Sequence, residues 1–305
     1  MTDFSMTRRR FGATLAGVAG LSLLPRLAFA QDAVATRTIT TVLGTYDIPA
    51  DPQRVLCIDS RLDLEPAVAL GLNVVGHAYG EPMAWVPSNP DWVYVGEAPN
   101  LEQVLALGPD LIICTDVGDP DSEWWPINRL REIAPVLPPP YTQPWKAIVA
   151  QIGGWTGREG QADAVLAEYD ALIADIKARH GDKIATRTVA AVQPADENMA
   201  YLQADSAFMQ PQVLADLGAK TLQPVEGGAV SAENYATVFG ELDGILLVNM
   251  AEGSTAPLDR SALWQRLPAV EAGAVLAPIG NTNYGGVYTA MHVARLFDEL
   301  YGMMD

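Results

Sequence analysis

The sequence predicts an α/β protein of two lobes joined by one long helix. Apolar residues between positions 161 and 179 recur at a spacing of three and four, which places them on one face of a helix roughly 28 Å long. Strand-like and helix-like segments alternate on both sides of this helix. No low-complexity linker separates the two halves, so the helix itself is predicted to connect them.

The long helix has one apolar face and one charged face. The charged face carries Asp163, Glu168, Asp170, Asp175 and Lys177. The apolar face consists of Ala162, Val165, Leu166, Tyr169, Leu172, Ile173 and Ile176. A helix resists the hinge bending that a loop permits, so we expect little motion of the lobes. The alternative is an ordinary surface helix of a single α/β domain.

Residues 1–30 have the pattern of an export signal. Arginines at positions 8–10 precede an apolar run at 12–24, and a small-x-small site follows at 28–30. The arginines followed by Phe11 are typical of the twin-arginine type. The apolar run is too short to span a membrane. We therefore expect cleavage near Ala30 and Gln31, a mature protein in the periplasm and no stable membrane insertion.

The composition excludes some partners. The net charge is −18 for the whole chain and becomes −21 when the four arginines and one aspartate of residues 1–30 are removed. Nucleic acid and anionic membranes are poor partners for such a chain. Its two cysteines, Cys57 and Cys114, each lie in an apolar run and are predicted to be buried thiols, with a disulfide as the alternative.

The first half, after an expected hairpin at 37–48, alternates strands and helices, which implies parallel pairing. Its strands are expected at 54–58, 73–76, 92–95, 110–114 and 135–137, and its helices at 64–70, 100–107 and 123–133. The second half repeats the alternation. Its strands are expected at 187–192, 244–248 and 274–277, and its helices at 211–217, 232–239, 263–267 and 287–301. The predicted division is an N-terminal lobe at 31–145, a linking helical segment at 146–184 and a C-terminal lobe at 185–305.

Six segments in sequence resemble the siderophore- and cobalamin-binding class of periplasmic substrate-binding proteins, which serve ABC importers. The matching stretches are IPADPQRVLCIDS (48–60), PNLEQVLALGPDLII (99–113), IAPVL (133–137), VSAE (230–233), WQRLPAVEAGAV (264–275) and GGVYTAMHVARL (285–296). The resemblance implies two Rossmann-like lobes on a helical backbone. It also implies a monomer that binds an iron(III)-siderophore and works with an inner-membrane permease and its ATPase.

Two glutamates carry a further implication of the resemblance. Glu102 lies two residues after Asn100, and Glu233 lies two residues after Ser231, so each is expected in the first turn of a helix behind an N-cap. Pairing with the helix dipole is reason enough for an acidic residue there. In the resembling family, one such glutamate on each lobe docks with arginines of the permease.

No catalytic or metal-binding pattern competes with this interpretation. The three histidines, His77, His180 and His292, have no paired spacing, and the sequence contains neither a Gly-rich phosphate loop nor a Gly-x-Ser-x-Gly motif. We expect no catalytic residues, no metal site and no cofactor. A sensor or an enzyme on the same fold remains the alternative.

The ligand site is expected beyond the carboxyl ends of the strands. Arg61, directly after the first strand of the first lobe, is the leading polar candidate and could pair with a carboxylate or hydroxamate oxygen. Aromatic rings in the same loops suit a bulky, partly polar chelate. These rings belong to Trp85, Trp124, Trp125, Tyr141, Trp145, Tyr201, Phe208, Tyr284 and Tyr288. A ferric siderophore, hydroxamate-like, is the expected cargo; haem, with Tyr284, Tyr288 or His77 as axial ligand, and cobalamin are the alternatives.

Overall fold

The computed structural model describes residues 35–195, 198–204, 207–252 and 254–305. These residues belong to one compact unit, 34–305. The predicted export signal at 1–30 lies outside the described residues. In the described ranges, no helix is both long enough and apolar enough to cross a membrane.

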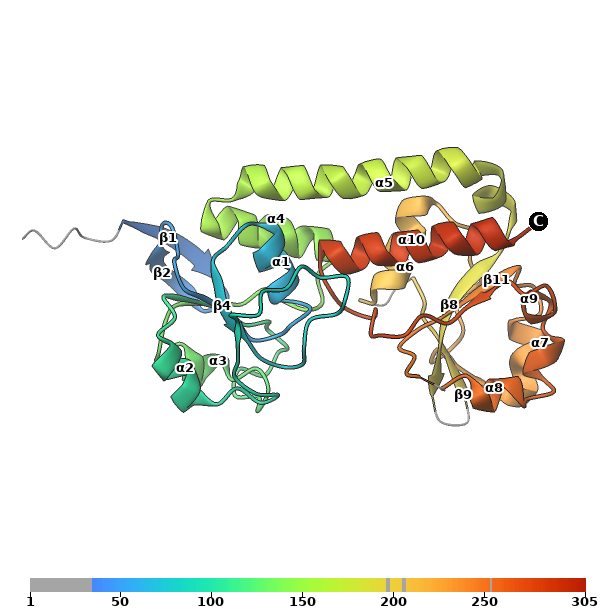
Figure 1. Cartoon of the computed structure of the whole chain (residues 1–305), viewed down its shortest axis with the longest axis horizontal. Coiled ribbons are helices and arrows are strands. Elements are labelled where there is room, and N and C mark those ends of the chain that lie inside the picture. The colour runs from blue at the N-terminus through green and yellow to red at the C-terminus, as the bar shows by residue number, and fades with distance from the viewer. Residues whose placement is uncertain (1–34, 196–197, 205–206, 253) are drawn as a thin grey trace, which may run out of the picture. The chain divides into compact units, whose positions relative to one another are not determined.

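The first half contains a hairpin and a five-stranded parallel sheet of order β5-β4-β3-β6-β7 (Figure 1). Its strands are β1 (Thr36–Thr41), β2 (Gly44–Pro49), β3 (Val55–Cys57), β4 (Val74–His77), β5 (Val93–Tyr94), β6 (Leu111–Ile113) and β7 (Val136–Leu137). Its helices are α1 (Leu64–Ala69), α2 (Leu101–Leu107) and α3 (Ile127–Leu130). The parallel pairing agrees with the predicted alternation.

The second half contains a five-stranded sheet of order β10-β9-β8-β11-β12. Its strands are β8 (Val189–Ala195), β9 (Asn198–Tyr201), β10 (Ala229–Ser231), β11 (Gly244–Leu247) and β12 (Val275–Leu276). Its helices are α6 (Met209–Leu217), η1 (Ala232–Asn234), α7 (Tyr235–Val238), α8 (Ala256–Asp259), η2 (Trp264–Arg266), α9 (Pro268–Glu271) and α10 (Val287–Met303). β9 and β10 pair antiparallel, which the prediction of parallel strands missed.

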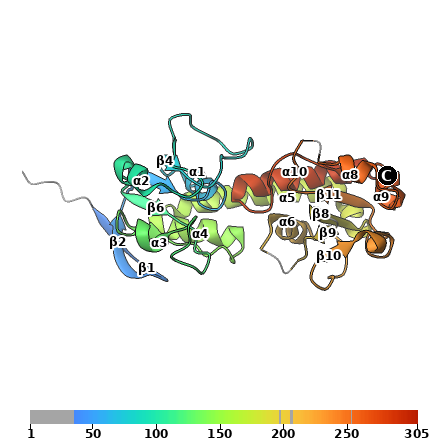
Figure 2. The same cartoon turned by 90° about the horizontal axis from the view of Figure 1, so that it is seen from below.

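The predicted connecting helix is α5 (Glu159–Thr186), which follows α4 (Trp145–Thr156). It is longer than the predicted range and has a kink at His180. The seven predicted apolar positions are all buried or half-buried, and the charged face is exposed. α10 packs beside α5, and both views show the two helices running together (Figures 1 and 2). α5 therefore connects the two halves, as predicted, and the C-terminal helix α10 packs along it.

Several short helices differ from their predicted ranges. Pro126 lies inside the predicted helix at 123–133, and only α3 forms there, beginning after this proline. The predicted helix at 263–267 is the 3₁₀ turn η2, and Pro268 then starts α9. Likewise, the predicted helix at 232–239 divides into η1 and α7.

Buried apolar clusters cover both faces of each sheet. The largest buried cluster includes residues of α1, α4, α5, α6 and α10 together with one face of each sheet. Two smaller clusters cover the opposite faces. Cys57 in β3 and Cys114, directly after the neighbouring strand β6, are free buried thiols, as expected. Burial, followed by the charge of Asp63, raises the pKa of Cys57 well above its ordinary value, so this thiol stays protonated.

Candidate functional site

The candidate site begins in the turn between β3 and α1. The Asp59 carboxylate accepts hydrogen bonds from the backbone N–H groups of Arg61 (2.8 Å) and Leu62 (3.0 Å), which fixes the turn. The Arg61 guanidinium returns to the same carboxylate, with Nε 3.2 Å from Oδ1 and Nη2 3.0 Å from Oδ2. Asp59 is fully buried, whereas the Arg61 side chain is 14% exposed. The predicted arginine therefore reaches the surface as one half of an ion pair.

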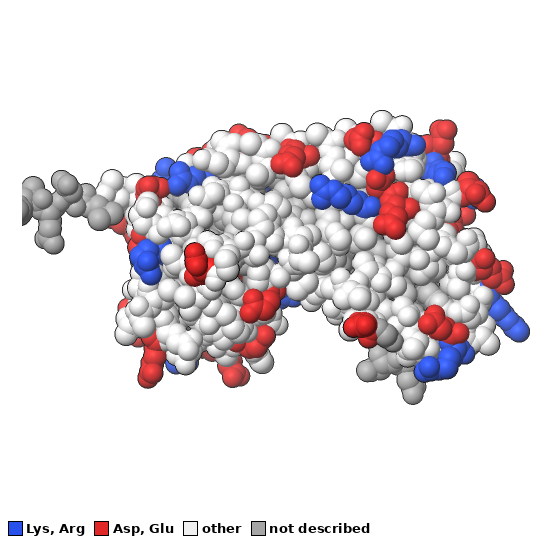
Figure 3. Space-filling view, viewed as in Figure 1, with Lys and Arg blue, Asp and Glu red and all other residues white. Residues whose placement is uncertain are grey.

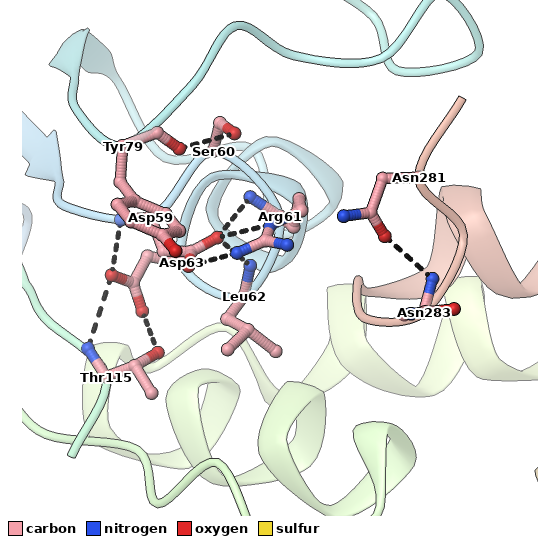
Figure 4. A network of polar contacts seen from close by, with 9 residues as sticks. All are labelled: Asp59, Ser60, Arg61, Leu62, Asp63, Tyr79, Thr115, Asn281 and Asn283. Carbon is pink, nitrogen blue, oxygen red and sulfur yellow. Dashed lines mark hydrogen bonds and ion pairs between the residues drawn. The ribbon is translucent and has the colours of Figure 1, made fainter. Parts of the chain in front are cut away.

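Aromatic rings from both halves surround this arginine. The guanidinium carbon lies 5.2 Å from the centre of the Tyr79 ring and 5.9 Å from that of Tyr284, distances at which a cation and a ring attract. Trp125 packs on Tyr79 at 4.6 Å, and Phe208 packs on Tyr284 at 5.3 Å. Figure 4 shows Arg61 beside Tyr79 of the first half, with Asn281 and Asn283 of the second half across from it. We call Arg61, Tyr79, Trp125, Phe208 and Tyr284 the arginine-aromatic cluster.

Tyr141 and Trp145 lie beside the cluster. A cavity of about 10 Å³ is lined by residues of both halves, including Leu62, Tyr141, Trp145 and Tyr284. It is too small for a chelate. Trp145 is 3% exposed and packs edge to face on Tyr169 of α5. Tyr141 and Trp124 are exposed, whereas Tyr79, Trp125, Phe208 and Tyr284 are half-buried and leave part of their rings accessible.

Three predicted ligand-binding aromatics lie elsewhere. Trp85 stacks on His292 of α10, with ring centres 4.0 Å apart, and donates its Nε1–H to the Thr289 hydroxyl at 2.9 Å. Tyr201 is buried in the core of the second half and donates its hydroxyl to the Leu222 carbonyl. Tyr288 packs against the largest core cluster. Aromatic residues in loops near a site can equally fill the core, and position in the sequence does not distinguish the two roles.

Two buried carboxyl groups lie next to the cluster. Asp63 accepts hydrogen bonds from the Asp59 N–H (2.8 Å), the Thr115 N–H (3.2 Å) and the Thr115 hydroxyl (2.6 Å), as Figure 4 shows. Burial raises the pKa of Asp63 to about 7, the charge of Asp59 adds to this, and the hydrogen bonds oppose it. This network ties the arginine turn to the carboxyl end of β6.

Glu65 connects the halves directly. From α1 it accepts hydrogen bonds from the Gly286 N–H (2.9 Å), the Thr289 N–H (2.9 Å) and the Thr289 hydroxyl (2.5 Å). Those N–H groups are at the beginning of α10, where a helix leaves its donors unpaired. Burial raises the pKa of Glu65 to about 7, against the effect of these bonds. The segment that carries Tyr284 is thereby held against α1, close to Arg61.

The histidines do not form a site. His77 packs between Trp92 and Tyr94 at the edge of the first sheet, and His180 pairs with Asp298. Over the described part of the chain, no group of three or more His, Cys, Asp or Glu side chains could hold a metal ion.

The two predicted docking glutamates are exposed in the first turns of their elements. Asn100 caps α2 by accepting hydrogen bonds from the N–H groups of Glu102 and Gln103, as predicted. Glu233 lies in the 3₁₀ turn η1 instead of an α-helix. Hydrogen bonds from its own N–H and from the Ser231 hydroxyl lower the pKa of Glu233. Their role in docking stays a prediction.

Sequence reasoning missed Tyr79 and Asp59. Tyr79 follows β4 just as Arg61 follows β3, so its position after a strand was an available signal. Its backbone is left-handed, with φ of 47°, which turns the chain directly after the strand. The pairing of Asp59 with Arg61 depends on side-chain rotamers and has no sequence pattern of its own.

Comparison with known proteins places these features in a family. A family model described as "Periplasmic binding protein" matches residues 89–277. The ferric enterobactin-binding periplasmic protein FepB of Escherichia coli O6:H1 is 31% identical over 173 residues, 51% of this chain and 53% of that protein. The iron(3+)-hydroxamate-binding protein FhuD of Bacillus subtilis is 24% identical over 251 residues, 78% of each chain. The matches to FepB and to the iron-uptake system-binding protein of B. subtilis span about half the length of those two proteins, 53% and 56%.

Solved structures share the fold. A periplasmic solute-binding protein of Mycobacterium smegmatis matches with a TM-score of 0.74 at 17% identity, over 88% of this chain and 98% of that chain. A FhuD fold-family protein of B. subtilis matches with a TM-score of 0.74 at 20% identity, over 86% and 98%. The family model covers more than half of the chain, and the neighbours have the same two-lobed fold. The chain belongs to the periplasmic binding protein family.

Proposed function

We propose that this protein captures an iron(III)-siderophore at the arginine-aromatic cluster and delivers it to an inner-membrane ABC importer. The observation that carries the proposal is the convergence of half-buried rings from both halves on one arginine, beyond the strands of the first sheet. Rings of this kind offer a wide apolar contact surface, and the guanidinium and tyrosine hydroxyls offer polar contacts.

Several findings support the proposal. Relatives of this chain are named for binding ferric enterobactin and iron(3+)-hydroxamate, and one structural neighbour holds Fe3+-Desferal. In this proposal the N-terminal lobe at 31–145 and the C-terminal lobe at 185–305 supply the two walls of the site, and the segment at 146–184 links them. The protein acts by binding and transfer, without catalysis, in the periplasm as an exported monomer. Glu102 and Glu233 contact the permease.

A fluorescence titration tests the proposed site. An iron-loaded siderophore should quench the tryptophan emission of the mature protein, because Trp125 belongs to the cluster, Trp124 precedes it in the chain, and ferric chelates absorb where indoles emit. Tyr284→Ala should weaken binding at least tenfold, equivalent to about 1.4 kcal/mol. Tyr201→Phe is the control. It removes a hydroxyl from the core, so it should lower the melting temperature and leave the affinity unchanged.

Arg61 requires a paired design. Arg61→Ala should weaken binding by roughly 1.5 to 3 kcal/mol if the arginine donates a charge-assisted hydrogen bond to the ligand. It also leaves the buried Asp59 carboxylate without a partner, which destabilises the fold. The double change Asp59→Asn with Arg61→Ala removes that unpaired charge and should regain stability while binding stays weak. Recovery of full affinity in the double variant would assign Arg61 a purely structural role.

A further inference from the structure

The loops predicted to face the ligand are poor in positive charge. In the sequence, Arg61 is the single Lys or Arg in the loops at 59–63, 78–89, 115–125, 138–145, 193–210, 249–257 and 278–288. Carboxylates are frequent in the same loops. Besides Asp59 and Asp63 they include Glu81, Asp116, Asp119, Asp121, Glu123 and Glu252. On the face shown in Figure 3, acidic groups lie on both halves, and several basic groups lie at the level of α5 and α10.

The charge of Arg61 is already balanced. Asp59 binds the guanidinium through two contacts, at 3.0 and 3.2 Å, and is itself held by two backbone N–H groups. Moving the guanidinium away from Asp59 would leave a fully buried carboxylate unpaired, which is costly, so the pair is expected to stay intact when a ligand binds. The neighbouring Asp63 is also a fully buried carboxyl group, so it supplies no positive charge to the site. The cluster therefore presents a neutral ion pair beside aromatic rings.

The loops that carry these carboxylates are part of the same site. The loop at 115–125 ends in Trp125, which contacts Tyr79, and the Tyr141 N–H donates to the Asp116 carbonyl. The loop that carries Asp116, Asp119, Asp121 and Glu123 therefore borders the cluster through Trp125. Like charges brought together in a partly desolvated site repel strongly, whereas aromatic faces attract cations.

We propose that the site selects its cargo by charge, taking ferric chelates that are neutral or cationic and rejecting trianionic ones. Three hydroxamates lose one proton each and leave Fe3+ in a neutral chelate. Three catecholates lose two protons each and leave three negative charges. This inference rests on the proposed function and names its substrate class, a tris-hydroxamate rather than a tris-catecholate chelate.

Titration of the wild-type protein at several salt concentrations tests the inference. The probes are a neutral ferric tris-hydroxamate, a ferric tris-hydroxamate that carries one free amine, and a trianionic ferric tris-catecholate. Both hydroxamates should bind at least about 100-fold more tightly than the catecholate at low salt. Added salt should strengthen catecholate binding, because it screens repulsion, and should leave the neutral chelate unaffected. Equal or tighter binding of the catecholate, or its weakening by salt, would overturn the inference.

Variants locate the source of the selectivity. Asp59→Asn keeps the oxygen that accepts the Arg61 and Leu62 N–H bonds and exposes the arginine charge to the ligand. It should shift the ratio of catecholate to hydroxamate affinity by about tenfold or more toward the catecholate. Because an unpaired arginine could prevent folding, a second variant combines Asp119→Asn, Asp121→Asn and Glu123→Gln on the exposed loop, and the ratio should move in the same direction.

Matched neutralisation elsewhere provides the control. Asp163→Asn with Glu168→Gln removes two charges from the exposed face of α5 and should leave the ratio unchanged. An equal shift in this control would show that total charge, and not the site, sets the selectivity. If the folded wild-type protein binds none of the three chelates, the proposed function itself is wrong. If it binds the catecholate best, the proposed function stands and only the charge selection fails.

Discussion

Asp63 shows how a single buried carboxyl group makes the stability of this protein depend on pH. Its three hydrogen bonds favour the charged form, whereas burial and the charge of Asp59 favour the neutral form. The balance raises its pKa from 3.8 to about 7. Because the pKa is higher in the folded than in the unfolded protein, this group contributes stability that is fully present below pH 4 and is lost as the pH rises through 7.

Asp63→Asn should therefore flatten the pH dependence of stability. The amide can accept both N–H bonds through its oxygen and can donate to the Thr115 hydroxyl, so the network is kept. The wild-type free energy of unfolding should fall relative to that of the variant between pH 4 and 7, by on the order of 4 kcal/mol. Denaturant titrations at a series of pH values measure this difference. Parallel curves for the two proteins would show that Asp63 has an ordinary pKa.

The site could be predicted from the sequence only in part. Arg61 follows the first strand of the first sheet, and Tyr284 lies in the loop before α10, so the rule for open α/β sheets finds both. The same rule included Trp85, Tyr201 and Tyr288, because a loop position does not tell whether a ring faces the ligand or the core. The Asp59–Arg61 pair could not be predicted, since two neighbouring residues pair only when the turn and both side-chain rotamers allow it.

At the scale of elements, α5 was the most predictable part of the fold. Its apolar positions recur with the helical period over several turns, and this face is buried against both halves. Short elements were less predictable. The strands β9 and β10 hold few residues, and prolines limit the helices near Pro126 and Pro268. Whether such short segments form a strand or a helix depends on tertiary contacts more than on local propensity.

A charge introduced on the buried face of α5 should destabilise the protein strongly, whereas one on the exposed face should change its stability little. Ile176 is fully buried, and Ala174 is exposed on the same helix. Ile176→Asp places a charge in the core and should lower the free energy of unfolding by at least about 3 kcal/mol. Ala174→Asp should change it by no more than about 0.5 kcal/mol. Thermal or denaturant unfolding measures both, and similar losses in the two variants would show that α5 does not pack by the face assigned to it.

At the scale of the whole described unit, the connections between the halves include α5, the α10 helix beside it, and the hydrogen bonds from Glu65 to the beginning of α10. Trp85 reinforces the last of these by bonding to Thr289 and stacking on His292. Helical and hydrogen-bonded connections resist bending, so we expect ligand capture with little change in the relative position of the halves.

Delivery to the importer should depend on Glu102 and Glu233 without any effect on binding. The double change Glu102→Ala with Glu233→Ala removes two exposed carboxylates at the starts of α2 and η1. Uptake of the iron-loaded siderophore by cells should be lost, and the affinity of the purified protein should be unchanged. Stability should fall by roughly 0.3 to 1 kcal/mol for each site. Glu132→Ala with Glu271→Ala, also exposed, is the control and should transport normally. Transport at the wild-type rate by the first double variant would exclude the docking role.

Native mass spectrometry of the mature protein after incubation with an equimolar mixture of a neutral ferric tris-hydroxamate, haem and cobalamin is the most direct test of cargo capture at the cluster. We predict a single adduct whose added mass equals that of the ferric chelate, and a smaller fraction of this adduct in Tyr284→Ala. An adduct of haem or cobalamin, a ferric adduct that persists unchanged in Tyr284→Ala, or a folded protein with no adduct would contradict the account.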